Sequence, residues 1–321
     1  MAKSEFCEIN IDNFFNMKGE MPFDVYVRLS DSKFTKIFKR GDTIDRSRFE
    51  VYAAKGVNEL YVHRSERREY IAATERLVQR ILQKGELSGS EAKKAVVELT
   101  EQTLFEVFDD HVFDEETVRR AQTTVRVYVE LVSSDVRTLA SFINLAKNQS
   151  YLCRHSIATA IFGVLLARGD SNVNDKTLTI VGLGGLLHDI GMSELPNEIN
   201  EVDRRLSPEE WAKVKQHPAL GIRMIEKSTN CPNEIRIVLE QHHEYWNGRG
   251  YPRGIKGEEI FYPARVVSIV DSFSALTTRR GGRALYSPED AIALMSTEEG
   301  KYDQKLLRKF AGLLNLKKKA A

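Results

Sequence analysis

The sequence predicts a mainly α protein in which a helical bundle follows a small α+β domain rich in strands. From residue 136 onward, apolar residues recur at helical spacing in one segment after another. Residues 22–66 instead alternate between apolar and polar side chains, as strands do. The chain has 321 residues, of which 42% are hydrophobic and 29% charged, a balance typical of globular proteins with real cores. This length suits two domains, and we place their boundary between residues 132 and 133.

The first domain, residues 1–132, is predicted to begin with strands and to end with helices. The segment PFDVYVRLS alternates, SDS supplies a turn and KFTKIFKRG returns, so a β-hairpin is expected, and NELYVH is a further short strand. Helices are expected around residues 90–108 and 115–132. Before them, one helical face is shared by Tyr70, Thr74, Leu77, Val78, Ile81 and Leu82. Such a module, with its helical connector, is typical of regulation or partner binding.

Composition excludes several classes of partner. The formal net charge is +1, which gives no electrostatic case for binding a nucleic-acid polymer or a membrane surface. Cys7, Cys153 and Cys231 are widely spaced and form no C-x-x-C pair, so reduced thiols and a cytoplasmic location are expected. The longest apolar stretch, residues 177–190, is too short to span a bilayer and carries three glycines. It therefore predicts a buried core helix.

Two helix starts in the second domain, residues 133–321, have strong signals. Ser207-Pro208-Glu209-Glu210 combines a capping serine, a proline at the first helical position and a glutamate at the third, which is a capping box. Ser287-Pro288-Glu289-Asp290 repeats the pattern with aspartate in the third position. We therefore expect one helix to begin at each of these serines.

Five of the seven histidines lie on predicted helices of the second domain. One helix carries His155, and an apolar helix ends at His188 and Asp189. The helix predicted from WAKVKQHPALGIRMI carries His217, and His242 and His243 close EIRIVLEQHHEYW. A single histidine on an apolar face is more often an ordinary core residue than a ligand. We interpret His63 and His111, which lack such company, in this ordinary way.

The whole set, however, predicts a metal site. Asp271 lies in the apolar run RVVSIVDSFSAL, where an ionised carboxylate is costly unless a cation or hydrogen bonds compensate it. Neutral imidazoles are good ligands for divalent transition metals, and helical bundles assemble dinuclear sites by projecting such ligands inward. The predicted ligands are His155, His188, Asp189, His217, His242, His243 and Asp271.

The order H…HD…H…HH…D, followed by HHEYWNGRGYPRG, resembles the HD-GYP family of cyclic-di-GMP phosphodiesterases. Gly250-Tyr251-Pro252 is the tripeptide that names the family, and His242-His243-Glu244 precedes it at the family spacing. The resemblance runs over most of residues 136–309. It implies a helical HD-type domain that hydrolyses cyclic-di-GMP to pGpG or GMP.

The resemblance also implies roles for single residues. One metal would be held by His155, His188, Asp189 and Asp271, and the other by Asp189, His217, His242 and His243. Asp189 would thus be the catalytic bridge, and a water shared by two ions, iron or manganese, would attack the phosphorus. After Asp271 the family carries a basic segment, which Arg280 and Arg283 match as substrate-binding residues for phosphate oxygens.

Three departures from the family pattern leave alternatives open. Gly282 replaces a tyrosine of the basic segment, Met192 replaces the lysine that follows the HD pair, and Tyr151 stands where some members have a glutamate ligand to a third metal. The intact ligands favour a hydrolase for cyclic-di-GMP, a related cyclic dinucleotide or another nucleotide. Met192 and Gly282 favour a weak or inactive module that binds the dinucleotide. Such a module could also dock a protein partner through the GYP loop or the N-terminal domain.

Overall fold

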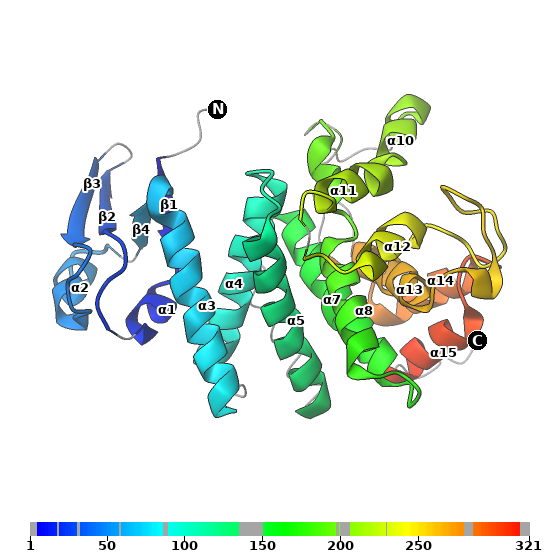
Figure 1. Cartoon of the computed structure of the whole chain (residues 1–321), viewed down its shortest axis with the longest axis horizontal. Coiled ribbons are helices and arrows are strands. Elements are labelled where there is room, and N and C mark those ends of the chain that lie inside the picture. Colours follow the sequence, from blue (N-terminus) through cyan, green and yellow to red (C-terminus); the bar gives the residue numbers. More distant parts are fainter. Residues whose placement is uncertain are drawn as a thin grey trace. The chain divides into compact units, whose positions relative to one another are not determined.

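The computed structural model describes residues 5–17, 19–30, 33–57, 59–85, 89–134, 150–196, 199, 206–228, 230–278 and 285–314. The chain forms two compact units, Met1–Gln102 and Thr103–Ala321. The fold is mainly α, with one small sheet near the N-terminus, as predicted (Figure 1). The domain boundary expected between residues 132 and 133 stays a prediction.

The first unit contains a four-stranded antiparallel sheet with strand order β1-β4-β2-β3. The strands are β1 (Phe6–Ile9), β2 (Val25–Ser30), β3 (Lys33–Phe38) and β4 (Leu60–His63). The β2–β3 hairpin and β4 were predicted, and β1 was not. The helix α2 (Arg46–Ala53), which follows the hairpin, was also missed because only Phe49 on it is buried, so it shows no apolar periodicity.

The helices of the first unit complete its core. These are α1 (Ile11–Asn16), the 3-10 turn η1 (Arg64–Glu66), α3 (Arg67–Lys84) and α4 (Ser90–Phe108), whose last residues belong to the second unit. Four residues of the predicted α3 face, Tyr70, Thr74, Leu77 and Val78, are buried, whereas Ile81 and Leu82 near the end of the helix are only partly buried. Tyr70 packs with Phe14, Phe23 and Phe38 in one apolar cluster.

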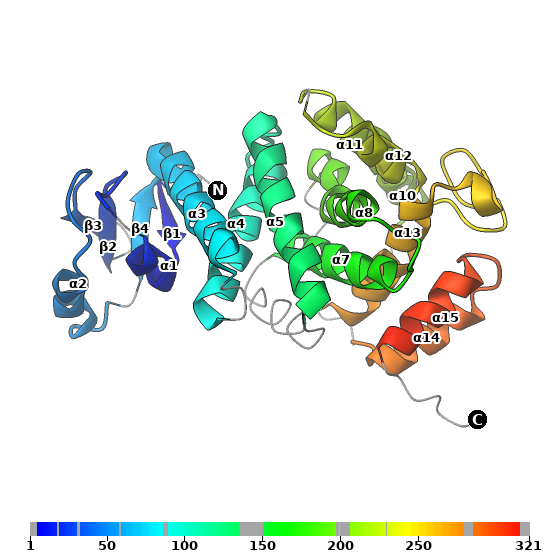
Figure 2. The same ribbon diagram turned by 60° about the horizontal axis from the view of Figure 1, so that its bottom comes forward.

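The second unit is a bundle of helices. Its elements are α5 (Glu115–Ser134), α7 (Tyr151–Arg168), α8 (Asp175–Leu187), η3 (Ile190–Glu194), α10 (Pro208–Val214), α11 (His217–Ile225), α12 (Asn233–Gln241), η4 (Gly257–Glu259), α13 (Tyr262–Thr277), α14 (Pro288–Thr297) and α15 (Gln304–Leu313). At its centre, α7 and α8 are joined by a short loop and pack side by side (Figure 2). The helix α5 packs on both, α13 contacts both, α12 contacts α8 and α13, and α11 packs on η3 and α12. Both α14 and α15 pack on α13.

The two predicted helix starts are confirmed. The Ser207 side chain accepts from the Glu210 N–H while the Glu210 carboxylate accepts from the Ser207 N–H, which completes a capping box. The Ser287 hydroxyl accepts from the Asp290 N–H at 3.1 Å. The single helix predicted through His217 is wrong, because α10 ends at Val214 and α11 begins at His217. Pro218 explains the break, because it has no backbone N–H to donate to the Val214 carbonyl one turn earlier and its ring would clash with that carbonyl, whereas proline is tolerated in the first turn of a helix.

The glycines of α8 let neighbouring helices approach closely. A Cβ on Gly185 would lie 2.8 Å from the Ala160 Cα of α7, and one on Gly184 would lie 2.7 Å from Val238 Cγ1 of α12. The predicted buried core helix is thereby confirmed, and its glycines set the spacing of three ligand-bearing helices. Among the described residues, every helix is too short or too polar to cross a membrane.

Candidate metal centre

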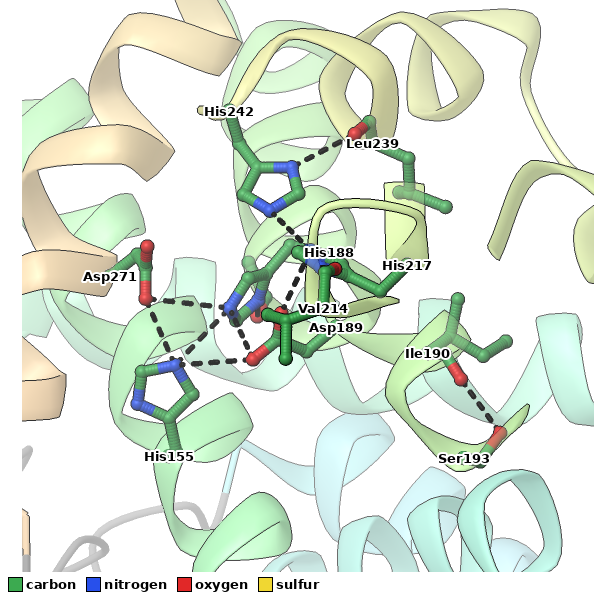
Figure 3. Close-up of polar contacts among 11 residues, drawn as sticks. His155, His188, Asp189, Ile190, Ser193, Val214, His217, Leu239, His242 and Asp271 are labelled. Carbon is green, nitrogen blue, oxygen red and sulfur yellow. Dashed lines mark hydrogen bonds and ion pairs between the residues drawn. The ribbon is translucent and has the colours of Figure 1, made fainter. Parts of the chain in front are cut away.

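The predicted ligands sit at helix ends and on inward-facing turns of the second unit. His188 and His242 directly follow the last residues of α8 and α12, and His217 is the first residue of α11. His155 lies in the second turn of α7, and Asp271 lies in the middle of α13. The structure brings these residues together with Asp189 between the helices (Figure 3). His243 joins the same cluster.

The cluster divides into two neighbouring groups. His155, His188 and Asp271 form the first group, and Asp189, His217, His242 and His243 form the second. Within each group the potential ligand atoms all lie within 4.8 Å of one another. In the first group, His155 Nε2 lies 3.1 Å from Asp271 Oδ1 and 3.2 Å from His188 Nε2. The corresponding pair in the second, His217 Nε2 and His242 Nε2, is also 3.2 Å apart.

Asp189 faces both groups. Its Oδ2 lies 3.3 Å from His188 Nε2 and 3.7 Å from His155 Nε2, both in the first group. Its Oδ1 lies 3.3 Å from His217 Nε2, in the second group. One carboxylate thus directs one oxygen to each group, which is the arrangement that a ligand shared by two cations requires.

Backbone carbonyls orient three of the imidazoles. The Nδ1 atoms of His188, His217 and His242 lie 2.9, 2.8 and 2.9 Å from the carbonyl oxygens of Gly185, Val214 and Leu239, respectively. A carbonyl only accepts hydrogen bonds, so each Nδ1 must carry the proton. A neutral ring then keeps its lone pair on Nε2, the atom that faces the centre. Metal-binding histidines ordinarily make such a hydrogen bond through the ring nitrogen that faces away from the metal.

Burial keeps the imidazoles of the second group neutral. It lowers the pKa of His243 to about 3, and the neighbouring His217 lowers it further. Burial likewise lowers the pKa of His242 well below its usual range, with His243 next in importance. The pKa of His217 is lowered by burial although Asp189 opposes the shift. All three rings therefore have lone pairs available for a cation at neutral pH.

The first group is held together by opposite charges. Burial alone would lower the pKa of His188, but the negative charge of Asp189 and then contact with Asp271 raise it well above its usual value. Burial would raise the pKa of both aspartates, yet the adjacent histidines lower both values. A proton at His188 therefore occupies a place that a metal cation can take. Imidazole and carboxylate donors in this arrangement fit two divalent transition-metal ions.

A family model described as an HD domain matches residues 144–306, about half of the chain. The chain belongs to the HD-domain family, and its Gly250-Tyr251-Pro252 motif places it in the HD-GYP group.

Three curated relatives and one solved structure are similar to this HD-GYP chain. It is 31% identical to a cyclic di-GMP phosphodiesterase of Pseudomonas aeruginosa over 54% of its own length and 41% of the relative's. It is 31% identical to a cyclic di-GMP phosphodiesterase of Thermotoga maritima over 45% of its own length and 40% of the relative's. It is 32% identical to a 3'3'-cGAMP-specific phosphodiesterase of Vibrio cholerae over 45% of its own length and 31% of the relative's. The chain thus spans about two fifths or less of these relatives.

A solved structure resembles the chain over most of its length. An HDG"Y"P protein from Bdellovibrio bacteriovorus matches with a TM-score of 0.66 and 20% identity, covering 97% of this chain and all of the other. At this identity the likeness concerns the fold alone. The match extends across the first unit, so the combination of a small sheet-bearing unit with an HD bundle occurs in both proteins.

The loop that carries the GYP motif packs directly on the second group of ligands. The Tyr251 ring stacks on the His243 ring, with centroids 4.8 Å apart and planes at 29°. The buried Glu244 carboxylate accepts from the backbone N–H groups of Arg253 at 2.6 Å and Gly254 at 3.1 Å. A Cβ on Gly250 would lie 2.4 Å from the His243 carbonyl oxygen, so only glycine fits there. Glu244 thus fixes the loop, a role that the sequence did not reveal.

The remaining candidate residues lie elsewhere or outside the described residues. Arg280, Gly282 and Arg283 belong to the residues that the structure does not describe. Met192 is 8% exposed and packs in an apolar cluster with Leu195, Ile199 and Val214. The Tyr151 ring stacks on His155 at 5.4 Å. His63 contacts Ser65, and His111 lies 3.4 Å from Glu194; neither belongs to the ligand groups.

Proposed function

We propose that this HD-GYP chain is a metal-dependent phosphodiesterase that hydrolyses cyclic-di-GMP to pGpG or GMP. The observation that carries the proposal is the position of Asp189, whose two carboxylate oxygens face two separate histidine groups. The names of the relatives from Pseudomonas aeruginosa and Thermotoga maritima support the substrate. The three free cysteines support the expected cytoplasmic location.

The first proposed ion would be held by His155, His188 and Asp271 and the second by His217, His242 and His243, and Asp189 would contribute to both. Iron or manganese suits these imidazole and carboxylate donors. When bound, such ions supply Lewis-acid chemistry: they acidify water and offset negative charge on a phosphodiester.

The chain's own residues supply orientation and shielding. The carbonyl-bonded rings of His188, His217 and His242 cannot turn without losing a buried hydrogen bond. His155, His188, His217 and His242 are at most 1% exposed, so the surrounding helices exclude bulk water from the imidazole side of the centre. Electrostatic interactions are stronger in such a site than in water.

Product formation tests the proposal. The protein is reconstituted with iron or manganese, its metal content is measured, and cyclic-di-GMP and 3'3'-cGAMP are each supplied while linear and mononucleotide products are followed by chromatography. Asp189→Asn should abolish turnover. Asp175→Asn is the matched control, because Asp175 lies at the other, solvent-exposed end of α8, and it should retain the parent rate. A fully metallated parent that cleaves neither dinucleotide contradicts the proposal, as does an active Asp189→Asn variant.

A second candidate function, supported by Met192, is a module that binds a cyclic dinucleotide without cleaving it. The family lysine at this position is replaced by a side chain buried against Leu195 and Val214, which removes a cation from the phosphate side. The GYP loop or the N-terminal unit would then dock a protein partner. Calorimetry should detect nucleotide binding without product. If the missing groups limit catalysis, Met192→Lys combined with Gly282→Tyr should raise turnover, and an unchanged rate favours the binding module.

A further inference from the structure

The chain segment that follows the last two histidines is attached to a turn far away in the sequence. The Trp246 N–H donates to the Lys301 carbonyl at 3.0 Å, and the Asn247 N–H donates to the Gly300 carbonyl at 2.8 Å. These hydrogen bonds join residues 246–247, which begin three residues after His243, to the turn between α14 and α15. We call residues 298–303 the 298–303 turn. Figure 2 shows the α14–α15 hairpin beside the loop that follows α12.

A lysine side chain of the 298–303 turn strengthens the same attachment. The Lys301 Nζ lies 5.6 Å from the Tyr245 ring centroid and forms an ion pair with Glu298 at 2.9 Å. The side chain of Lys301 is only 23% exposed, and a cation attracts an aromatic ring more strongly when water is largely excluded. The ammonium group therefore binds the residue two positions after His243 to the 298–303 turn.

Arg265 connects this turn to the helix that carries Asp271. Arg265 lies on α13, six residues before Asp271, and its guanidinium carbon is 5.6 Å from the Trp246 ring centroid. Its Nη1 lies 3.0 Å from Asp303 Oδ2, and both side chains are largely buried. The other carboxylate oxygen of Asp303 accepts from N–H groups in the first turn of α15 and caps that helix. One guanidinium group thus links α13, the segment after α12 and the start of α15.

The two histidines depend on such contacts because α12 ends at them. The last residue of α12 is Gln241, so His242 is its cap and His243 lies beyond the helix. The regular hydrogen bonds of the helix therefore stop here, and other contacts must fix the chain that follows. Glu244 anchors the later part of the loop through two backbone N–H groups, and the 298–303 turn anchors residues 246–247.

We propose that the 298–303 turn positions the second group of metal ligands, and that Gly300 and Lys301 are its positioning residues. Both act through residues 245–247, whose placement holds His242 and His243 at the centre. Gly300 allows the two backbones to approach, and Lys301 supplies the charge that binds the Tyr245 ring. The inference rests on the two-ion centre proposed above but not on the identity of the substrate.

Lys301→Met tests the charge, because methionine keeps an apolar stem and removes the ammonium group. In titrations with manganese, the dissociation constant of the more weakly held ion should rise about 10-fold, the lower end of the loss that follows removal of an outer contact at a metal site. Paramagnetic resonance at limiting manganese should then show more of the signal of an isolated ion and less of that of the coupled pair. Lys301→Arg keeps the charge and should restore the parent value. An unchanged dissociation constant in Lys301→Met overturns the assignment of Lys301.

Gly300→Ala tests the close approach. Gly300 has a φ of +73°, and a Cβ there would lie 2.6 Å from the Asn247 Nδ2 and 2.9 Å from the Asn247 Cβ, so Asn247 must move away. Metal content should fall below that of the parent through loss of the ion at the second group. Gly56→Ala is the matched control, because Gly56 has a φ of +82° but a Cβ there meets no atom within 4 Å. It should carry similar backbone strain and keep both ions, and a Gly300→Ala variant that also keeps both ions overturns the assignment of Gly300.

Leu307→Ala distinguishes positioning from general stability. Leu307 lies on α15 and is buried in the apolar cluster of the second unit, so its truncation should lower the melting temperature at least as much as the substitutions in the 298–303 turn. Its affinity for both ions should equal that of the parent. A loss of metal as large as that of Lys301→Met would show that any weakening of the hairpin releases the ion, and it would overturn the proposal.

Metal titrations together with assays on cyclic-di-GMP separate this inference from the proposed function. An active parent whose Lys301→Met and Gly300→Ala variants keep the parent affinity for both ions overturns the inference and leaves the proposed function standing. A parent that binds two ions but cleaves no dinucleotide contradicts the proposed function, and weakened binding in the two variants then still supports the inference. A parent that binds no second ion overturns both.

Discussion

Replacing Gly191 with alanine should separate the two halves of the metal centre. Gly191 lies in η3, two residues after Asp189, and packs against the first turn of α11. A Cβ at this position would lie 2.0 Å from the His217 carbonyl oxygen and 2.5 Å from the Gly221 nitrogen. Both are backbone atoms, so no flexible side chain can yield. Since ordinary contact begins at 3.4 Å, η3 and α11 must part by about 1.4 Å.

That movement is large compared with what a metal site tolerates. Asp189 Oδ1 and His217 Nε2 are 3.3 Å apart and lie on the two segments that would separate. Ligand positions must hold to within roughly 0.5 Å, so the second group should lose its ion. The ligands of the first group come from α7, α8 and α13 and are not displaced directly. Overpacking costs about 1–3 kcal/mol, which lowers the melting temperature by roughly 2–12 °C in a unit of this size.

Elemental analysis and thermal unfolding of the reconstituted protein measure both effects. Metal content should fall from about two ions per chain towards one. Gly312→Ala is the control, because a Cβ at this α15 position meets no atom within 4 Å and removes a helix-weakening glycine. It should keep both ions and melt no lower than the parent. A Gly191→Ala variant with two ions per chain and the parent melting temperature would refute the coupling between η3 and α11.

Three further perturbations have definite expected outcomes. Metal affinity should weaken as the pH falls from 8 to 6, because a cation must displace the proton that the raised pKa of His188 retains; pH-independent titrations would contradict this. Burial and then Glu98 raise the pKa of Glu101 from 4.5 to about 8, so the folded state keeps a proton that the unfolded state loses as the pH rises. The Glu101→Gln variant should therefore match the parent in unfolding free energy near pH 4. Its unfolding free energy should exceed that of the parent increasingly towards pH 8, by on the order of 1 kcal/mol per pH unit at most. Chains truncated to begin at residue 103 or 133 test the domain boundary: the shorter one lacks α5 and should melt lower, whereas equal melting would support a boundary at residues 132 and 133.

The sequence predicted the fold class and most helices because apolar residues repeat at helical spacing over long segments, and a single sequence is enough to show this pattern. It failed where an element is short or poorly amphipathic. The strand β1 pairs with β4, but its sequence FCEI does not alternate between apolar and polar residues, and α2 buries only Phe49. The break before His217 could have been inferred from Pro218, because proline is tolerated in the first turn of a helix but not in its interior.

The candidate ligands could be named from the sequence, whereas the residues around them could not. Burying a histidine or aspartate on an apolar helical face costs free energy unless a partner compensates it. The sequence alone shows where such residues lie. Glu244 is an ordinary charged residue in the sequence. Its placement follows from a loop that returns to His243, which is a tertiary feature. Close contacts such as that of Gly191 are likewise visible only after folding.

The helix ends explain why the ligands are found where they are. The last carbonyls of a helix lack partners within it, and those of Gly185, Val214 and Leu239 in the final turns of α8, α10 and α12 accept from ligand imidazoles. The same three helix ends converge on the centre and carry partial negative charge, which favours cations. The hydrogen bonds that satisfy the helix-end carbonyls are therefore the same bonds that orient the imidazoles. Substitutions that shift α8 against α7 or α12 should consequently disturb metal binding as strongly as the loss of a ligand.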